Sequence, residues 1–167
     1  MSDTVAGNTG TTASLVVYEP VEGLIDQAGD SDWYRLNLEL GWGYHLVLQG
    51  ASSEAGTLVD PYLALRNASG GVIDFEDDSF NLGLDALIDF VPTASGIYYA
   101  DATGVGSGTG SYTLTLLPDQ LDNTSSRAEL IEGEPTPGFM LDTQDVDWFR
   151  VTLAAGVSYQ IDMVDAS

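Results

Sequence analysis

The sequence predicts an all-β protein: an antiparallel, jelly-roll-like β-sandwich that is followed by a truncated second copy. Three observations carry this prediction. Short segments of alternating apolar and polar residues recur along the chain, and glycine-rich turns separate them. No segment has the periodicity of an amphipathic helix. A long stretch also repeats itself at a constant spacing, which indicates internal duplication at the scale of a domain.

The repeat relates Gly29 to Leu36 (GDSDWYRL) to Gln144 to Val151 (QDVDWFRV), an offset of 145 − 30 = 115 residues. The same offset pairs Gly23 with Gly138, Leu38 with Leu153, Gly41 with Gly156, Tyr44 with Tyr159, and Ala51-Ser52 with Ala166-Ser167. The chain therefore holds one complete module and the opening part of a second. Tandem modules are typical of large secreted or surface proteins, so we expect an extracellular location.

Residues 1–14 are rich in glycine, threonine, asparagine and serine and lack periodicity, which predicts a flexible arm. The complete module follows over residues 15–117. Its expected strands lie at 33–38, 44–48, 62–67, 72–75, 84–91, 97–100 and 111–116. Leu40-Gly41-Trp42-Gly43 is the expected turn between the first two strands.

Residues 118–126 are polar and turn-rich, which predicts a linker to the second copy over residues 127–167. That copy supplies only the first strands of a sandwich, and its apolar residues cannot close a core alone. They are Phe139, Leu141, Trp148, Phe149, Val151, Leu153, Tyr159 and Ile161. We expect the copy either to be poorly ordered or to be completed by pairing with another chain, which would be strand-swapped self-association through residues 127–167.

The charge of the chain argues against two classes of partner. The net charge is −22, from 26 acidic residues against four arginines and no lysine. A field of this sign repels nucleic acid and anionic membranes, and no apolar run is long enough for membrane insertion. Cations, cationic ligands, and neutral sugars held through a metal ion are the favoured partners. The alternative is that the acidic surface only keeps the protein soluble in a salty environment.

Calcium is the expected cofactor. Cysteine is absent, so disulfides cannot stabilise the loops, and bound calcium is a common substitute in secreted proteins. Asp60 and the loop from Asp74 to Asp78 belong to one expected hairpin, where their carboxylates would converge and repel one another unless a cation binds. The expected ligands are Asp60, Asp74, Glu76, Asp77 and Asp78, with Asp30 and Asp32 from the turn that both copies share.

Asp30 and Asp32 also have a structural interpretation, in which Asp30 accepts turn amides and Asp32 pairs with Arg35. Zinc is disfavoured, because the chain has no cysteine and a single histidine.

Three residues are candidates for contact with a ligand: Trp42, Tyr99 and Asp101. Trp42 lies between two glycines in a turn, where an exposed indole could stack on a sugar or a peptide. Tyr98 and Tyr99 point to opposite faces of their strand, so one of them is expected in the core and the other on the surface. Trp33, which recurs as Trp148, is expected to anchor the core.

Five motifs occur in a fixed order: Gly-Asp-x-Asp-Trp-Tyr-Arg from Gly29, Gly-Thr-Leu-x-Asp-Pro-Tyr-Leu-x-Leu from Gly56, the acidic loop from Asp74, Ser-Gly-x-Tyr-Tyr from Ser95, and Gly-Ser-Tyr-Thr-Leu from Gly110. In this order the chain resembles the bacterial pre-peptidase C-terminal domain over residues 15–117. The resemblance implies a jelly-roll-like sandwich that often binds calcium and is not itself catalytic. Such domains are appended to secreted proteases, including collagenases, or built into RTX-type adhesins. Trp42 and Asp101 depart from the family pattern.

Catalysis finds little support in the sequence. His45 lies in the middle of an expected strand, and the chain has no elbow-type serine motif to accompany it. A phosphate-binding glycine loop and a metalloprotease motif are also absent from the sequence. We therefore expect that the protein is not an enzyme.

Together these features predict a calcium-binding module of a large bacterial secreted or surface protein, resembling an adhesin, that binds an extracellular glycan or peptide beside neighbouring modules of the same polypeptide. The alternative is a spacer or accessory domain of an exported protease, in which calcium gives only rigidity.

Overall fold

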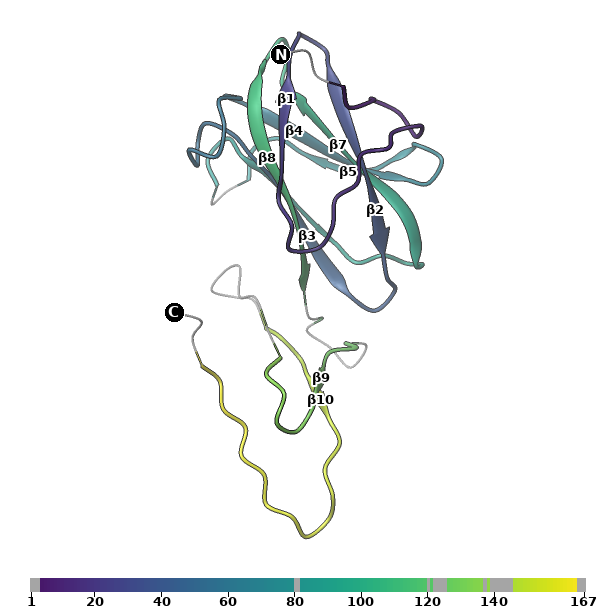
Figure 1. Ribbon diagram of the computed structural model, residues 1–167, viewed down its shortest axis with the longest axis vertical. Coiled ribbons are helices and arrows are strands. Elements are labelled where there is room, and N and C mark those ends of the chain that lie inside the picture. Colours follow the sequence, from purple (N-terminus) through teal and green to yellow (C-terminus); the bar gives the residue numbers. More distant parts are fainter. Residues whose placement is uncertain are drawn as a thin grey trace.

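The computed structural model describes residues 4–79, 82–119, 121, 126–136, 138 and 146–164. The described residues form strands joined by turns and loops (Figure 1). The strands are β1 (Val21–Ile25), β2 (Ser31–Leu38), β3 (Gly43–Gln49), β4 (Pro61–Asn67), β5 (Val72–Glu76), β6 (Ala86–Phe90), β7 (Gly96–Gly104), β8 (Gly110–Asp119), β9 (Glu129–Leu130) and β10 (Arg150–Val151). None of the described residues belongs to a helix long and apolar enough to cross a membrane.

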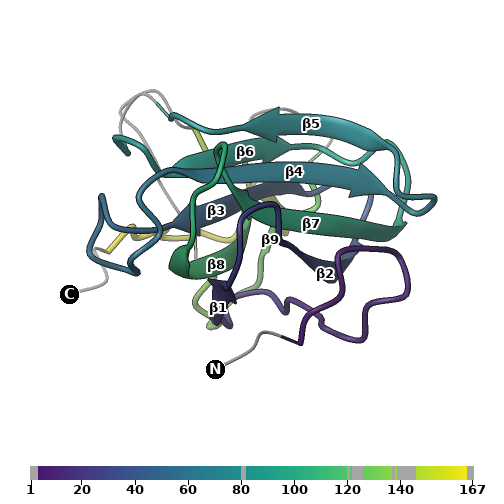
Figure 2. The same cartoon turned by 90° about the horizontal axis from the view of Figure 1, so that it is seen from above.

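Two four-stranded sheets make the sandwich, with strand orders β1-β8-β3-β6 and β2-β7-β4-β5. Every pairing within them is antiparallel. Apart from the β4–β5 hairpin, consecutive strands from β1 to β8 fall in opposite sheets, so the chain crosses between the layers at almost every turn (Figure 2). The predicted all-β sandwich is therefore confirmed.

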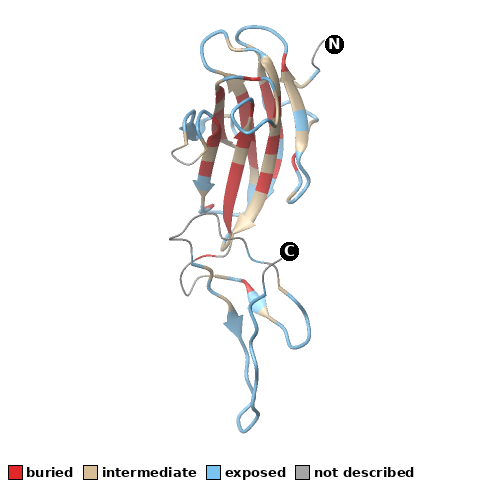
Figure 3. Ribbon diagram, turned by 90° about the vertical axis from the view of Figure 1, so that its left-hand side faces the viewer, coloured by how far each residue is buried: buried red, intermediate tan, exposed pale blue. Residues whose placement is uncertain are grey.

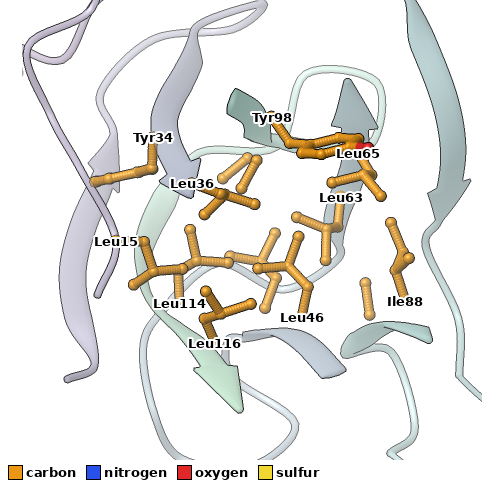
Figure 4. Packing of buried hydrophobic residues seen from close by; sticks show 14 of the residues in the cluster. Leu15, Tyr34, Leu36, Leu46, Leu63, Leu65, Ile88, Tyr98, Leu114 and Leu116 are labelled. Carbon is orange, nitrogen blue, oxygen red and sulfur yellow. The ribbon is translucent and has the colours of Figure 1, made fainter. Parts of the chain in front are cut away.

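The core lies between the two sheets and follows the two-residue period of the strands. In β2 the side chains of Tyr34, Leu36 and Leu38 point inward and are buried. They face Leu114 and Leu116 of β8 across the sandwich, among the other buried leucines shown in Figure 4. Leu36 and Leu114 are 0% exposed, so the alternation read from the sequence is the alternation of the core.

The expected strands are present, but the sequence interpretation missed β1. This strand reads Val-Glu-Gly-Leu-Ile, and its central glycine weakens the strand signal. Its place in the sheet comes from pairing with β8, in which Gly23 lies opposite Tyr112. An added Cβ at Gly23 would lie 2.1 Å from the Tyr112 ring, so the glycine is what lets that ring cross the edge strand.

The described part of the predicted flexible arm, residues 4–14, is packed on the sandwich. The amide of Arg35 in β2 donates to the carbonyl of Ala13 at 2.9 Å, and Ser14 forms a bridge to Arg35. The Tyr99 hydroxyl donates to the carbonyl of Thr9 at 3.2 Å. The expectation of a free arm is wrong here, because the segment satisfies the edge of β2 and covers the outer face of its sheet.

The second copy extends away from the end of the sandwich at which β8 ends (Figure 1). Its β9 and β10 form a parallel pair of two residues each. Trp148, Leu153 and Ile161 are 47%, 52% and 65% exposed, and most of the segment is drawn as exposed in Figure 3. The predicted Phe139 and Leu141 lie outside the described residues.

This distribution of burial predicts where truncation of a leucine matters. Leu114→Ala, at a fully buried position, should lower the free energy of unfolding by about 2–5 kcal/mol, because it leaves a cavity between the sheets. Leu153→Ala is the matched control and should change it by less than about 0.5 kcal/mol. Urea unfolding followed by circular dichroism measures both. A comparable loss in the two variants would show that the second copy shares the core.

Candidate functional site

An acidic cluster forms at one end of the β4–β5 hairpin. Asp60 precedes β4, and Asp77 and Asp78 follow β5. The two strands are antiparallel, so the start of one and the end of the other lie at the same end of the sheet (Figure 2). The carbonyl of Asp60 also accepts the amide of Val105 at 3.0 Å, which ties the cluster to the loop between β7 and β8.

Asp60 is the most perturbed acidic residue of this end. Burial raises the pKa of its carboxyl, and the negative charges of Asp78 and Asp77 raise it further. Its Oδ1 atom is buried and has no hydrogen-bond donor among the described residues. A carboxylate that is partly buried, lacks a hydrogen bond at one oxygen and is repelled by two neighbours is stabilised by a cation.

Asp85 is a fully buried carboxylate at this end, and the sequence interpretation missed it. It is 0% exposed, its Oδ1 accepts the amide of Gly50 at 2.8 Å, and its Oδ2 has no donor within the described part of the chain. Its carbonyl accepts the amide of Ser79 at 3.0 Å. The available signal was an aspartate between Leu84 and Ala86, directly before the apolar residues that begin β6.

The other two predicted ligands of the hairpin lie along β5. Asp74 is exposed and accepts the amide of Phe75 at 2.9 Å through Oδ1, and Glu76 is exposed opposite Leu63. Over the residues that the structure describes, no three acidic or histidine side chains are grouped closely enough to hold a metal ion by themselves. A calcium ion at Asp60, Asp77 and Asp78 would therefore also use loop carbonyls, which calcium accepts readily.

The turn that both copies share has a structural role. Asp30 accepts its neighbours' amides, from Ser31 at 2.9 Å and from Asp26 at 3.3 Å, and its carbonyl accepts the Thr103 hydroxyl at 2.6 Å. This is the turn-stabilising interpretation of Asp30.

Asp32 lies inside the sandwich, 0% exposed, which corrects its assignment as a metal ligand. Its Oδ2 accepts the Tyr112 hydroxyl at 2.5 Å, and the Tyr112 and Tyr34 hydroxyls are 2.9 Å apart. Burial raises the pKa of the Tyr112 phenol, and the neighbouring Tyr34 and Asp32 raise it further. The phenol therefore stays protonated and donates a hydrogen bond to the carboxylate. Arg35 is exposed on the opposite face of β2, because successive strand residues alternate.

Two predicted ligand contacts are buried on the outer face of the β2-β7-β4-β5 sheet. Asp101 is 4% exposed and is held by Arg66, with 2.7 Å to Nη2 and 2.8 Å to Nε, and by the Ser31 hydroxyl at 2.5 Å. Tyr99 is 7% exposed beneath the arm. Neither can serve as an open contact surface, because the arm and this ion pair already cover them.

Trp33 is buried, as expected, but on this outer face instead of in the core. The Arg66 guanidinium lies 4.4 Å above its ring, and the Tyr99 ring lies 5.8 Å away. Tyr98 points the other way and joins the core, so the predicted alternation of Tyr98 and Tyr99 is confirmed. The predicted surface position of Tyr99 is wrong, because residues of the arm, which were expected to be free, cover its side chain.

Trp42 is half-buried and packs against the core from the turn between β2 and β3, where Gly41 has a φ of 91°. It borders an open, mostly apolar hollow of about 300 Å³. The hollow is lined by Val17, Tyr18, Glu39, Trp42, Tyr44, Pro118 and Thr136.

His45 is tied to carboxylates. Its Nδ1 lies 2.5 Å from Asp89 Oδ1, and its Nε2 lies 3.5 Å from Asp119 Oδ2. It is 8% exposed on β3. These contacts agree with a structural strand histidine.

Several solved structures are similar to this chain, among them two at low sequence identity. No protein-family model matches the chain, and no curated protein matches its sequence. The pre-peptidase C-terminal domain of a collagenase from Bacillus anthracis is similar in structure, at 14% identity and a TM-score of 0.44, over 62% of this chain and 93% of that one. PliG, a periplasmic inhibitor of g-type lysozyme from Aeromonas hydrophila, is similar at 14% identity and a TM-score of 0.42, over 63% and 96%. The first is a domain of the family that the sequence resembles, and both likenesses concern the fold alone.

The outer-face ion pair predicts that substituting Arg66 alone lowers the free energy of unfolding more than substituting Arg66 and Asp101 together. Arg66→Met should lower the free energy of unfolding by about 3–5 kcal/mol, because it leaves the Asp101 carboxylate buried without its cation. Adding Asp101→Leu should restore a large part of that loss. Urea unfolding of the two single variants and the double variant measures their coupling. Additive losses would contradict the arrangement.

The raised pKa of Asp60 predicts an inverted pH dependence without metal. Because the folded-state pKa lies above the unfolded-state value, stability is highest below the unfolded pKa and falls as pH rises through the folded pKa. Asp60→Asn should remove this fall, so the variant gains stability over the parent as pH increases. Urea unfolding in chelator from about pH 3 to pH 7 tests it, with the exposed Asp74→Asn as control. A gain that does not grow with pH, or an equal gain in the control, would contradict it.

Proposed function

We propose that this sandwich is a non-catalytic spacer or accessory module of an exported protein, stabilised by calcium at its acidic end. Asp60, Asp77 and Asp78 would hold the ion together with loop carbonyls. The observation that carries the proposal is Asp60, whose carboxyl is desolvated, unpaired at Oδ1 and repelled by two neighbouring carboxylates. Calcium would offset that repulsion and fix the loops around it.

The absence of cysteine and the acidic surface support an exported setting for such a module. Its loops need a stabiliser other than disulfides, and an extracellular medium supplies calcium. The sequence repeat at 115 residues supports a place in a series of similar modules.

A spacer role is favoured over recognition of a glycan or peptide by the burial of the predicted contact residues. Tyr99 and Asp101 are 7% and 4% exposed and contact other parts of the same chain. Of the three candidates only Trp42 remains partly accessible, and it also packs against the core. The adhesin-like role therefore has one remaining residue to support it, whereas the metal-stabilised role has Asp60, with its unpaired Oδ1 and two neighbouring carboxylates.

Thermal melts in chelator, in millimolar calcium and in millimolar magnesium test the proposal. Calcium at about 100 times its Kd adds about 2.7 kcal/mol, which raises Tm by roughly 10 °C or more for a sandwich of this size. Asp60→Asn should abolish the rise, while Asp74→Asn should keep it. An equal rise with magnesium, or a calcium rise that survives Asp60→Asn, would reject the site.

A further inference from the structure

The second copy already has the local backbone contacts of the first half of the sandwich. The Arg150 amide donates to the Ala128 carbonyl at 2.8 Å, as the Arg35 amide does to Ala13 at 2.9 Å. Two further hydrogen bonds recur at the same offset of 115 residues. The Glu134 amide donates to the Ile131 carbonyl as the Glu19 amide does to Val16, and the Ala154 amide donates to the Tyr159 hydroxyl as the Glu39 amide does to Tyr44. Gly156 and its equivalent Gly41 also share a left-handed backbone conformation. The described part of the second copy, residues 127–136, 138 and 146–164, therefore repeats these local contacts of residues 12–49, the first half.

The inward-facing side chains of the first half also have apolar equivalents in the second copy. Tyr34, Leu36, Leu38, Tyr44, Leu46 and Leu48 correspond to Phe149, Val151, Leu153, Tyr159, Ile161 and Met163. The first set is buried, whereas Val151, Ile161 and Met163 are 38%, 65% and 98% exposed. Five of these six equivalents in the second copy, all but Phe149, are thus exposed.

The structure also shows what covers such a face. Residues 58–116, from Leu58 to Leu116 of β8, are the acceptor half, and they supply the other side of the core. Leu63, Leu65, Ile88, Tyr98, Leu114 and Leu116 lie in the same buried cluster as the side chains of the first half (Figure 4). The acceptor half of the same chain therefore has the residues that fit the exposed face of the second copy.

We propose that the acceptor half is an interaction surface with two competing partners in one chain, the first half and the second copy. When residues 127–164 replace residues 12–49, the result is a circularly permuted sandwich in which β8 leads into the strands that complete it. In a series of such modules, each acceptor half could be closed by the first half that precedes it or by the one that follows.

The connection is long enough for this exchange. The Tyr18 amide donates to the Leu116 carbonyl at 3.0 Å, so the first half begins where the acceptor half ends. Adjacent ends are the condition under which circular permutation is tolerated. Tyr18 lies five positions after Ala13 in the sequence. Ala128, the residue that would take the place of Ala13, lies twelve positions after Leu116. At about 3.3 Å per residue the chain has the reach.

The first half has two advantages that explain why it occupies the acceptor half. Tyr34 supplies a hydroxyl 2.9 Å from that of Tyr112, and its equivalent Phe149 cannot. The arm before the first half covers Tyr99, with the Thr9 carbonyl accepting its hydroxyl. Each advantage is a single hydrogen bond with a modest net contribution, so damage to the first half should reverse the preference.

A charge placed in the first half of the full-length chain tests the exchange. Leu36→Asp puts a carboxylate at a fully buried position. The background Trp33→Phe/Trp42→Phe leaves Trp148 as the only one of the three tryptophans, so its emission reports its burial. Leu36→Asp should then fold cooperatively as a monomer, with the Trp148 emission shifted to shorter wavelength relative to the background.

Two double variants make the test specific. Leu36→Asp/Val151→Asp places a second charge on the inward face of the second copy and should lose both the cooperative transition and the emission shift. Leu36→Asp/Thr152→Asp adds the same charge at the next residue, which points to the opposite face, and should keep both. Loss of folding in Leu36→Asp alone, an unshifted Trp148, or equal behaviour of the two double variants would overturn the proposal. A dimer with buried Trp148, seen by light scattering, would overturn closure within one chain.

Discussion

Each sheet of the sandwich can bury its apolar face only against the other sheet, and the rest of the structure depends on this constraint. Leu36 of one sheet and Leu114 of the other are 0% exposed because the two layers meet. The chain crosses between the layers at nearly every turn, so neither sheet is made of one continuous segment. Among the described residues of the segment 127–167, by contrast, Trp148, Leu153 and Ile161 are 47%, 52% and 65% exposed.

The outer face of the β2-β7-β4-β5 sheet shows a second way to bury a surface. An ion pair between Arg66 and Asp101, the Trp33 ring under the guanidinium and the arm over Tyr99 join the strands on the side away from the core. This layer stabilises the sheet and also removes the surface that a ligand would use. The covered aromatic residues are therefore structural, although aromatic residues on a sheet face are often recognition sites.

The strongly acidic composition is accommodated in two different ways. Asp32 lies inside the core and is stabilised by the protonated Tyr112 hydroxyl. Asp60 lies among like charges at the acidic end, where no such donor reaches its Oδ1 within the described residues. A core carboxylate with its own donor needs no ion, whereas Asp60, repelled by two neighbouring carboxylates, would be stabilised by the calcium ion that we propose. This difference separates the structural aspartates from the candidate ligands.

The sequence by itself determined the all-β class, the strands from β2 to β8, the repeat and the acidic hairpin end, because each depends on local alternation or on neighbours in one hairpin. Asp60, Asp77 and Asp78 could be grouped from the sequence, since β4 and β5 are consecutive. The tertiary structure alone decided that Asp32 and Asp101 are buried, that Asp85 belongs to the acidic end, and that the arm covers Tyr99. These facts depend on residues such as Thr9 and Tyr99, which lie 90 positions apart and meet only when the sheets are assembled.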